Sequence, residues 1–315
     1  MRHSISRRNF IHRSALGACA CAAFHPLTAA TPSELIIDIH QHVHYHGRSA
    51  QQMIAHQLAM GISKTIILPA GRPKVRKSTR GGRSNGLAAK VAGNEAALDV
   101  VKQNPGKYYL GANEVTDLDN ARQEIEKYLK LGAIVIGEQK FDVEVDSAQS
   151  QDIYRLAADY KVPILMHFQY RTYNRGFERF WKMLEKHPQT NFIGHAQTWW
   201  ANIDKNHDPK TGLYPTGPVT AGGLTDQYLQ NYPNMYADMS AGSGLNSLLR
   251  DEEHTIGFFE RNQDKVIYGS DCADTLGRGP SCQGSRTIDA VRRLSSTPTI
   301  RRKILHDNAM NLLRF

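Results

Sequence analysis

Eight short runs rich in β-branched and aromatic residues alternate with longer segments between residue 34 and the C-terminus, and this alternation constrains the fold more than any other feature. The runs are ELIIDIH (34–40), SKTIILP (63–69), KYYLGA (107–112), AIVIGE (133–138), VPILMH (162–167), NFIGH (191–195), NMYADMS (234–240) and KVIYGSD (265–271). The segments between them place apolar residues at helical spacing, as in NEAALDVVKQN before Pro105 and LDNARQEIEKYLKLG ending at Gly132.

Strands and helices in alternation favour a parallel sheet covered by helices. Eight such units in a chain of 315 residues predict a single-domain (β/α)8 barrel, also called a TIM barrel. A doubly wound open sheet is the alternative, but that fold usually has fewer strands, and no GxGxxG phosphate loop follows any run. We expect no domain boundary within residues 31–315.

Residues 1–30 differ from the rest of the chain because they contain four Arg and no Asp or Glu. A basic start, a short apolar stretch and small residues before a cut near Ala30 are typical of an export signal. Arg7 and Arg8, followed by Phe10 and Ile11, resemble a twin-arginine signal. We therefore expect the barrel of residues 31–315 to be exported to the periplasm or the outside of the cell. A basic tail without a targeting role is the alternative.

The charge of the chain excludes some partners. Removing the four arginines of residues 1–30 lowers the net charge from +9 to +5, a mild excess that is not typical of a nucleic-acid-binding protein. No apolar run reaches 18 residues, so no membrane-spanning helix is expected. Cys272 and Cys282 can pair in an oxidising compartment, whereas a structural zinc site is disfavoured because neither belongs to a CxxC motif.

Polar residues stand at the carboxyl ends of five of the eight runs. They are Asp38, His40 and His42 in the first run and its continuation, Glu138 in the fourth, His167 in the fifth, His195 in the sixth and Asp271 in the eighth. In a barrel these ends meet at one mouth, where active sites lie. Imidazole and carboxylate are ligands of divalent ions such as zinc, so the pattern predicts a metal site at the C-terminal face. Alternation along the first strand predicts that Asp38, His40 and His42 share one face.

The motifs IDIHQH, ILMH, FIGH and VIYGSD, with the closing segment KILHDNAMNLLRF (303–315), resemble the amidohydrolase superfamily in its amidohydrolase-related branch. The resemblance covers residues 34–315. It implies that His40, His42, His167 and Asp271 bind the metal, and that Asp271 is also the general base. It implies that His195 binds a second ion or polarises a substrate carbonyl, and that Asp38 orients a ligand.

The resemblance leaves the fourth strand open. Glu138 or a carboxylated Lys140, which share a face, would bridge two ions, and a carboxylate outside the ligand set or in a salt bridge is the alternative for Glu138. One or two ions, zinc foremost, are therefore expected.

Two loops near the expected mouth suggest substrate contacts. Arg72 begins a loop, GRPKVRKSTRGGR (71–83), that is rich in Lys and Arg and has no acid, which suits an anionic small-molecule substrate. Trp199 and Trp200 closely follow His195 and either line a substrate pocket or pack against the barrel.

These features predict a metal-dependent hydrolase that cleaves an amide, ester or lactone with metal-activated water. A metal-dependent non-oxidative decarboxylase is the alternative enzyme, because the branch resembles both groups. An exported binding module without catalysis is the alternative from another class. The sequence carries no signal for the oligomeric state.

Overall fold

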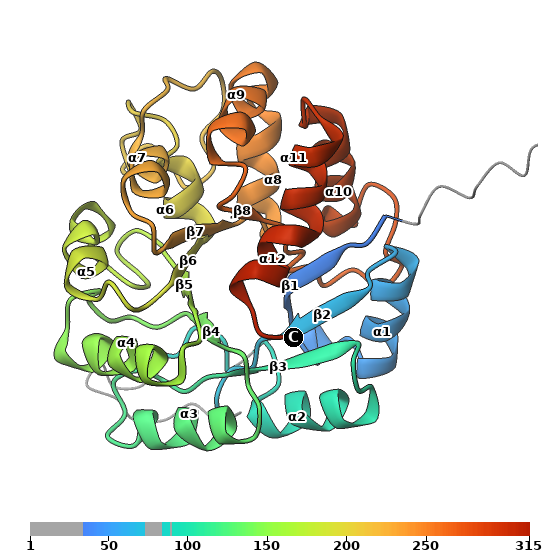
Figure 1. The fold of residues 1–315 in the computed structure, drawn as a ribbon, viewed down its shortest axis with the longest axis vertical. Coiled ribbons are helices and arrows are strands. Elements are labelled where there is room, and N and C mark those ends of the chain that lie inside the picture. The colour runs from blue at the N-terminus through green and yellow to red at the C-terminus, as the bar shows by residue number, and fades with distance from the viewer. Residues whose placement is uncertain (1–33, 73–83, 89) are drawn as a thin grey trace, which may run out of the picture. The chain divides into compact units, whose positions relative to one another are not determined.

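The computed structural model describes residues 34–72, 84–88 and 90–315, and within this part eight parallel strands form one sheet in the order β1 to β8 (Figure 1). The strands are β1 (Ile37–Gln41), β2 (Lys64–Ile67), β3 (Tyr108–Ala112), β4 (Val135–Gln139), β5 (Ile164–His167), β6 (Phe192–His195), β7 (Met235–Asp238) and β8 (Val266–Ile267). Backbone hydrogen bonds from Asp271 N to His40 O (2.8 Å) and from Ile39 N to Tyr268 O (3.3 Å) join β1 to the segment after β8. The predicted (β/α)8 barrel is confirmed. The predicted export signal and most of the basic loop (73–83) lie outside the described residues.

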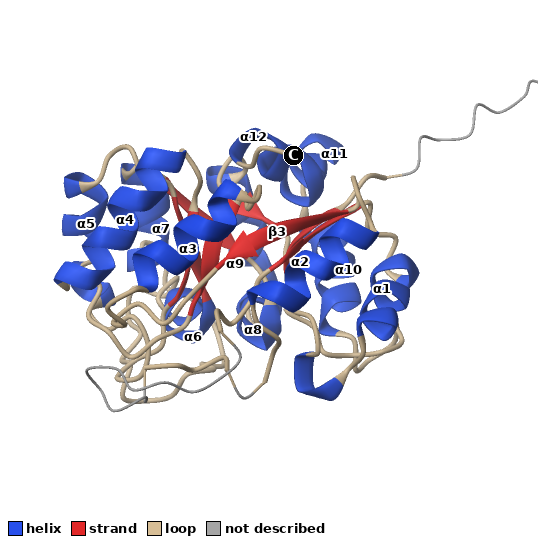
Figure 2. Ribbon diagram, turned by 90° about the horizontal axis from the view of Figure 1, so that it is seen from below, coloured by secondary structure: helices blue, strands red, loops and turns tan. Residues whose placement is uncertain are grey.

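Helices surround the strands on the outside of the barrel (Figure 2). They are α1 (Ala50–Ala59), α2 (Asn94–Gln103), α3 (Ala121–Lys130), α4 (Ala148–Tyr160), α5 (Trp181–Lys186), α6 (Ala196–Ala201), α7 (Leu224–Asn231), α8 (Ala241–Leu249), α9 (Glu252–Asn262), α10 (Gln283–Leu294), α11 (Pro298–Arg302) and α12 (Asn308–Leu312). Short 3-10 turns η1 (Tyr45–Gly47) and η2 (Phe177–Arg179) and a π-helical turn η3 (Lys303–Asp307) complete the set. Among the described residues, no helix is long and apolar enough to cross a membrane.

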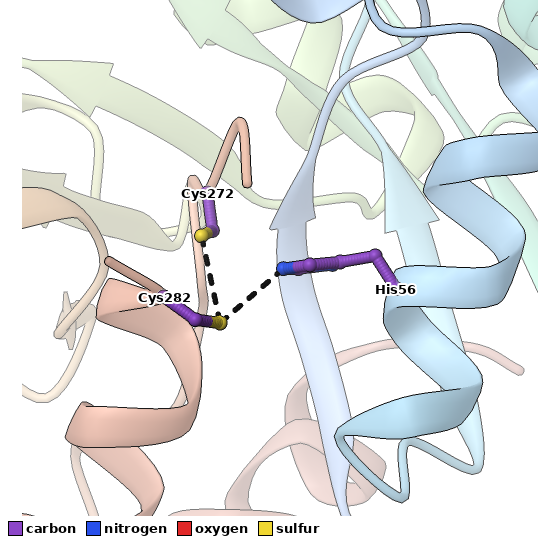
Figure 3. A group of neighbouring side chains, drawn as sticks. All are labelled: His56, Cys272 and Cys282. Atoms are coloured by element: carbon purple, nitrogen blue, oxygen red, sulfur yellow. Dashed lines mark hydrogen bonds between the residues drawn. The ribbon is translucent and has the colours of Figure 1, made fainter. Parts of the chain in front are cut away.

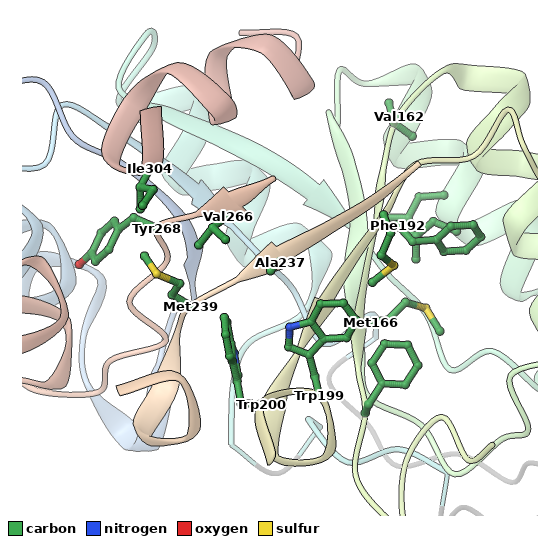
Figure 4. Close-up of a cluster of buried hydrophobic side chains, with 14 of the residues drawn as sticks. Val162, Met166, Phe192, Trp199, Trp200, Ala237, Met239, Val266, Tyr268 and Ile304 are labelled. Atoms are coloured by element: carbon green, nitrogen blue, oxygen red, sulfur yellow. The ribbon is translucent and has the colours of Figure 1, made fainter. Parts of the chain in front are cut away.

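The barrel has an inner and an outer hydrophobic core. The inner one takes side chains from six of the strand regions and from the C-terminal segment, namely Ile37, Ile39, Ile66, Leu68, Val135, Leu165, Ile193, Ile267, Ala309 and Leu313. The outer one lies between the strands and the helices and is larger (Figure 4). Burial of each of these large side chains contributes about 1.5–3 kcal/mol, so the two cores hold the strand ends in fixed positions.

Trp199 and Trp200, which were considered as substrate contacts, belong to the outer core (Figure 4). Trp199 is fully buried and stacks on Phe168 at a centroid distance of 6.2 Å. A Cβ added at Gly194 would lie 2.3 Å from the Trp199 ring, so the strand backbone packs directly against the indole. The indole N–H of Trp200 donates to the backbone carbonyl of Asp238. Of the two alternatives for these residues, packing against the barrel is the one the structure favours, because α6 turns both side chains into the core.

Trp199→Ala should destabilise the protein by about 3–5 kcal/mol, the usual cost of deleting a buried aromatic side chain. The free energy of unfolding from urea denaturation measures this loss. Leu58→Ala is the surface control, because Leu58 is 76% exposed and its loss should change stability by less than about 0.5 kcal/mol. Equal effects of the two substitutions would contradict a core role for Trp199.

Candidate metal centre

Six predicted ligands meet at the carboxyl ends of the strands, and all of their side chains are buried. They are His40, His42, Glu138, His167, His195 and Asp271. The imidazole centroids of His40 and His195 are 4.6 Å apart, and those of His167 and His195 are 5.3 Å apart. The geometry thus brings together residues from five strand ends that span more than 200 positions of sequence.

Three imidazoles direct an unprotonated Nε2 at the centre of this group. Nδ1 of His42 lies 2.6 Å from the Leu68 carbonyl and donates its proton there. Nδ1 of His40 lies 2.7 Å from Oδ2 of Asp238 and donates to that carboxylate. The hydroxyl of Ser240 donates to the same carboxylate oxygen (2.7 Å) and accepts from Nδ1 of His195 (3.0 Å). Each hydrogen bond fixes the tautomer that leaves a lone pair on Nε2.

Glu138 stands between two sets of nitrogen ligands. Its Oε2 lies 3.3 Å from Nε2 of His40 and 3.4 Å from Nε2 of His42. Its Oε1 lies 2.5 Å from Nδ1 of His167 and 3.7 Å from Nε2 of His195. The two oxygens of one carboxylate therefore face two different groups.

The carboxylate of Asp271 also lies near both sets of imidazoles. Its Oδ1 lies 3.4 Å from Nε2 of His42, and its Oδ2 lies 3.8 Å from Nε2 of His195. Burial raises the pKa of Asp271, but the imidazoles of His40 and His42 outweigh burial and lower it below its ordinary value. The Asp271 carboxylate is therefore ionised at neutral pH.

The donor set fits a divalent cation. Within the described residues, Nε2 of His195 and Oδ1 of Asp271 are buried without a hydrogen-bond partner. The Nε2 atoms of His40 and His42 are 3.2 Å apart, so they either share a proton or lie on the same side of a bound cation. Buried polar atoms without a partner are costly, and a cation would satisfy all of these atoms together.

The electrostatics of the two central histidines agree with this fit. Burial lowers the pKa of His195 to about 4, so the imidazole is neutral and able to bind a metal at pH 7. Burial lowers the pKa of His40 as well, but the carboxylates of Asp271, Asp238 and Glu138 outweigh burial and raise it. The carboxylates that favour a proton on His40 would in the same way stabilise a metal cation at that position.

Asp238 and Ser240, at the end of β7, are site residues that the sequence analysis missed. Asp238 accepts from His40 and also lies 3.3 Å from Nδ1 of His195, so it orients two ligands at once. The signal was present in the run NMYADMS, which ends in polar residues at the same strand position as the other candidates.

We expect Asp238→Asn to weaken metal binding by about 10–100-fold, because the carboxylate fixes the tautomer and ring orientation of His40. Titration of the protein with Mn²⁺ against a competing chelator measures this affinity. Asp289→Asn is the control, since that carboxylate is exposed and pairs with Arg292 far along α10. An unchanged affinity in Asp238→Asn would show that Asp238 does not position the ligand.

The Asp38 side chain turns toward α1 and the segment after β8, and its carboxylate also accepts from the backbone N–H of the ligand residue His40 (3.0 Å), as an orienting residue would. Its carboxylate accepts from Gln57 on α1 (2.9 Å) and from both the backbone N–H (2.8 Å) and the hydroxyl of Ser270. Asp38 therefore holds the segment that carries Asp271 and does not touch an imidazole ring.

Arg72 and Lys140, which were considered for substrate and ligand roles, lie against other side chains of the chain. The Arg72 guanidinium donates to the buried carboxylate of Glu114 (2.6 Å) and lies 3.9 Å from that of Glu124, so its charge is already compensated by carboxylates of the chain. Lys140 places its ammonium group 5.8 Å from the centroid of Tyr173. Glu138, and not Lys140, occupies the middle of the ligand group.

Comparisons with known proteins bear on the fold. No family model and no curated protein matches the sequence. Solved structures do match. A 2,6-dihydroxybenzoate decarboxylase from Rhizobium is 14% identical, covers 89% of this chain and 98% of its own, and has a TM-score of 0.55. A probable 2-pyrone-4,6-dicarboxylic acid hydrolase from Acinetobacter baumannii is 12% identical, with coverages of 88% and 98% and a TM-score of 0.54.

A dihydroxybenzoic acid decarboxylase from a Polaromonas species, solved with manganese and an inhibitor, is 17% identical, with coverages of 84% and 86% and a TM-score of 0.52. These structures are 12–17% identical to this chain, so the likeness is one of fold, and it agrees with the predicted (β/α)8 barrel. They include both hydrolases and decarboxylases, and a shared fold does not choose between these reactions.

Proposed function

We propose that this chain is a metal-dependent hydrolase whose centre holds two divalent ions bridged by Glu138. The observation that carries the proposal is the position of the Glu138 carboxylate, with one oxygen toward His40 and His42 and the other toward His167 and His195. His40 and His42 would hold one ion and His167 and His195 the other, with Asp271 beside both. Zinc and manganese both suit these nitrogen and oxygen ligands.

The residues of the chain divide the catalytic work. Ions bound here supply Lewis acidity and lower the pKa of water. Asp271, ionised and with a free buried oxygen, takes a proton from the attacking water and returns it to the leaving group. Asp238 keeps His40 and His195 oriented throughout, and the buried setting strengthens each of these interactions.

The substrate we propose is a small ester, lactone or amide that bears a carboxylate. Lys140 supports this choice, because after burial its positive charge is the main influence that lowers the pKa of His167, which places a cation beside the ligand group. The proteins of known structure with this fold include ones named for dihydroxybenzoates and for a pyrone dicarboxylic acid.

Decarboxylation is the second candidate, favoured by the decarboxylases among the matching structures. The Mn²⁺- or Zn²⁺-loaded protein should be assayed on aromatic carboxylate esters, lactones and amides and, in parallel, on hydroxybenzoates, in water labelled with ¹⁸O. The proposal expects one ¹⁸O atom in the product carboxyl group and no carbon dioxide. Release of carbon dioxide, with no ¹⁸O incorporated into the organic product, would favour decarboxylation. Absence of turnover across both panels, with bound metal present, would favour a binding module.

We also propose that residues 1–30 direct export by the twin-arginine route. Arg7→Lys with Arg8→Lys should retain the full-length chain in the cytoplasm of a bacterial host, because this route reads the arginine pair. Fractionation and immunoblotting of the periplasm measure the effect, and Arg13→Lys is the control within the same segment. Normal export of the double variant would contradict the proposal.

A further inference from the structure

A second group of buried ligand atoms is formed by His56, Cys272 and Cys282 (Figure 3). His56 projects from α1, Cys272 directly follows Asp271, and Cys282 caps the start of α10. All three side chains are buried, and their ligand atoms lie within 4.8 Å of one another. Both thiols are free, so the structure does not contain the disulfide that the sequence left open.

The distances in this group match those around a metal ion. The two Sγ atoms are 3.8 Å apart, and Sγ of Cys282 is 3.4 Å from Nε2 of His56. Bonds of ~2.3 Å to sulfur and ~2.0 Å to nitrogen at tetrahedral angles place two sulfurs about 3.8 Å apart and a sulfur and nitrogen about 3.5 Å apart. A disulfide needs ~2.0 Å between the sulfurs, so the pair is spaced for a shared ion.

A fourth ligand and the charge balance fit the same ion. Sδ of Met60, the residue that caps the C-terminus of α1, lies 3.7 Å from Sγ of Cys282. Two thiolates, an imidazole and a thioether form a soft set that selects zinc or copper(I) over harder ions. Two thiolates neutralise a dication, which suits a pocket where an uncompensated charge would be costly. The backbone N–H of Ser285 at the start of α10 donates to the Cys282 sulfur.

We propose that His56, Cys272, Cys282 and Met60 bind one thiophilic metal ion, zinc or copper(I), that is separate from the catalytic centre. The ion would tie the segment after β8 to α1. Asp271 adopts a φ of 41°, a conformation that a non-glycine residue keeps only when its surroundings hold it. An ion bound by Cys272 would fix the backbone next to Asp271, so the site would position the general base.

This site was disfavoured in the sequence because neither cysteine belongs to a CxxC motif. The spacing rule fails here because the histidine ligand lies 226 positions from Cys282 and is brought near it only by closure of the barrel.

The test uses cobalt(II) as a probe in the full-length protein with Cys19→Ser and Cys21→Ser, which is the wild type of this test and has Cys272 and Cys282 as its two cysteines. Cobalt bound by thiolates gives an intense near-ultraviolet charge-transfer band, whereas cobalt bound by nitrogen and oxygen at the catalytic centre does not. The wild type should reach the full band at one bound thiolate-ligated ion per chain. Cys272→Ser and Cys282→Ser should lose it, His56→Gln should weaken and shift it, and His187→Gln, a matched histidine control outside both sites, should keep it.

Two measurements on the wild type do not depend on the folding of any variant. Titration of the zinc-loaded protein with an organomercurial, in the presence of a chromogenic chelator, should release one zinc per chain as the two thiols react. If zinc and cobalt are not taken up, competition of copper(I) with bicinchoninate should instead show one tightly bound copper(I) per chain. The proposal would be overturned if cobalt(II), zinc and copper(I) all fail to bind at these cysteines. It would also be overturned if the mass of the protein is lower by two hydrogens, because the cysteines have then formed a disulfide. None of these outcomes depends on the catalytic ions.

Discussion

Replacing Asp271 with asparagine should lower kcat/KM by at least about 10³-fold, because a general base contributes ~10²–10⁴-fold and the residue also faces the metal ligands. Asparagine keeps the size of the side chain and the backbone hydrogen bond from residue 271 to His40 O. It cannot accept the proton of water and does not carry the negative charge that His40 and His42 stabilise. Steady-state kinetics on the best substrate of the ester and lactone panel measure the loss.

The fold should survive this change, which circular dichroism and urea denaturation would verify. Asp264→Asn is the matched control, because that carboxylate is exposed and pairs with Lys303 at the surface. Activity within tenfold of the wild type in Asp271→Asn would remove Asp271 from the role of base.

Glu138→Gln should reduce bound manganese from about two ions per chain to one or none, and should lower turnover by at least about 10³-fold. The amide has one oxygen in place of two, and its NH2 group would point at one of the two imidazole sets. Manganese is the probe because a soft thiolate site does not select it. Equilibrium dialysis followed by elemental mass spectrometry measures the ratio.

Glu178→Gln, on an exposed glutamate that pairs with Arg179, should keep both ions. Two ions in Glu138→Gln would show that the carboxylate does not bridge, and would favour a mononuclear site made of His40, His42, His167 and Asp271.

Much of the architecture could be predicted because it depends on local patterns. Each strand is a short buried run, and parallel strands have their carboxyl ends on one side, so residues such as His167 and His195 could be placed together without coordinates. Asp238 follows the same rule, because it is the last residue of β7, and the sequence therefore carried the signal for it.

The remaining features depend on contacts between distant parts of the chain. The guanidinium of Arg72 is neutralised by Glu114, 42 positions away. Whether Trp199 lines a pocket or the core depends on the turn at Ala196, whose φ of 80° directs α6 back over the barrel. None of these features leaves a periodic signal in the sequence.

The most direct test of the two-ion centre is an anomalous difference map from crystals of the manganese-loaded protein. We predict two peaks on opposite sides of the Glu138 carboxylate, one beside the Nε2 atoms of His40 and His42 and the other beside His167 and His195. A single peak, or none at this carboxylate, would contradict the central claim.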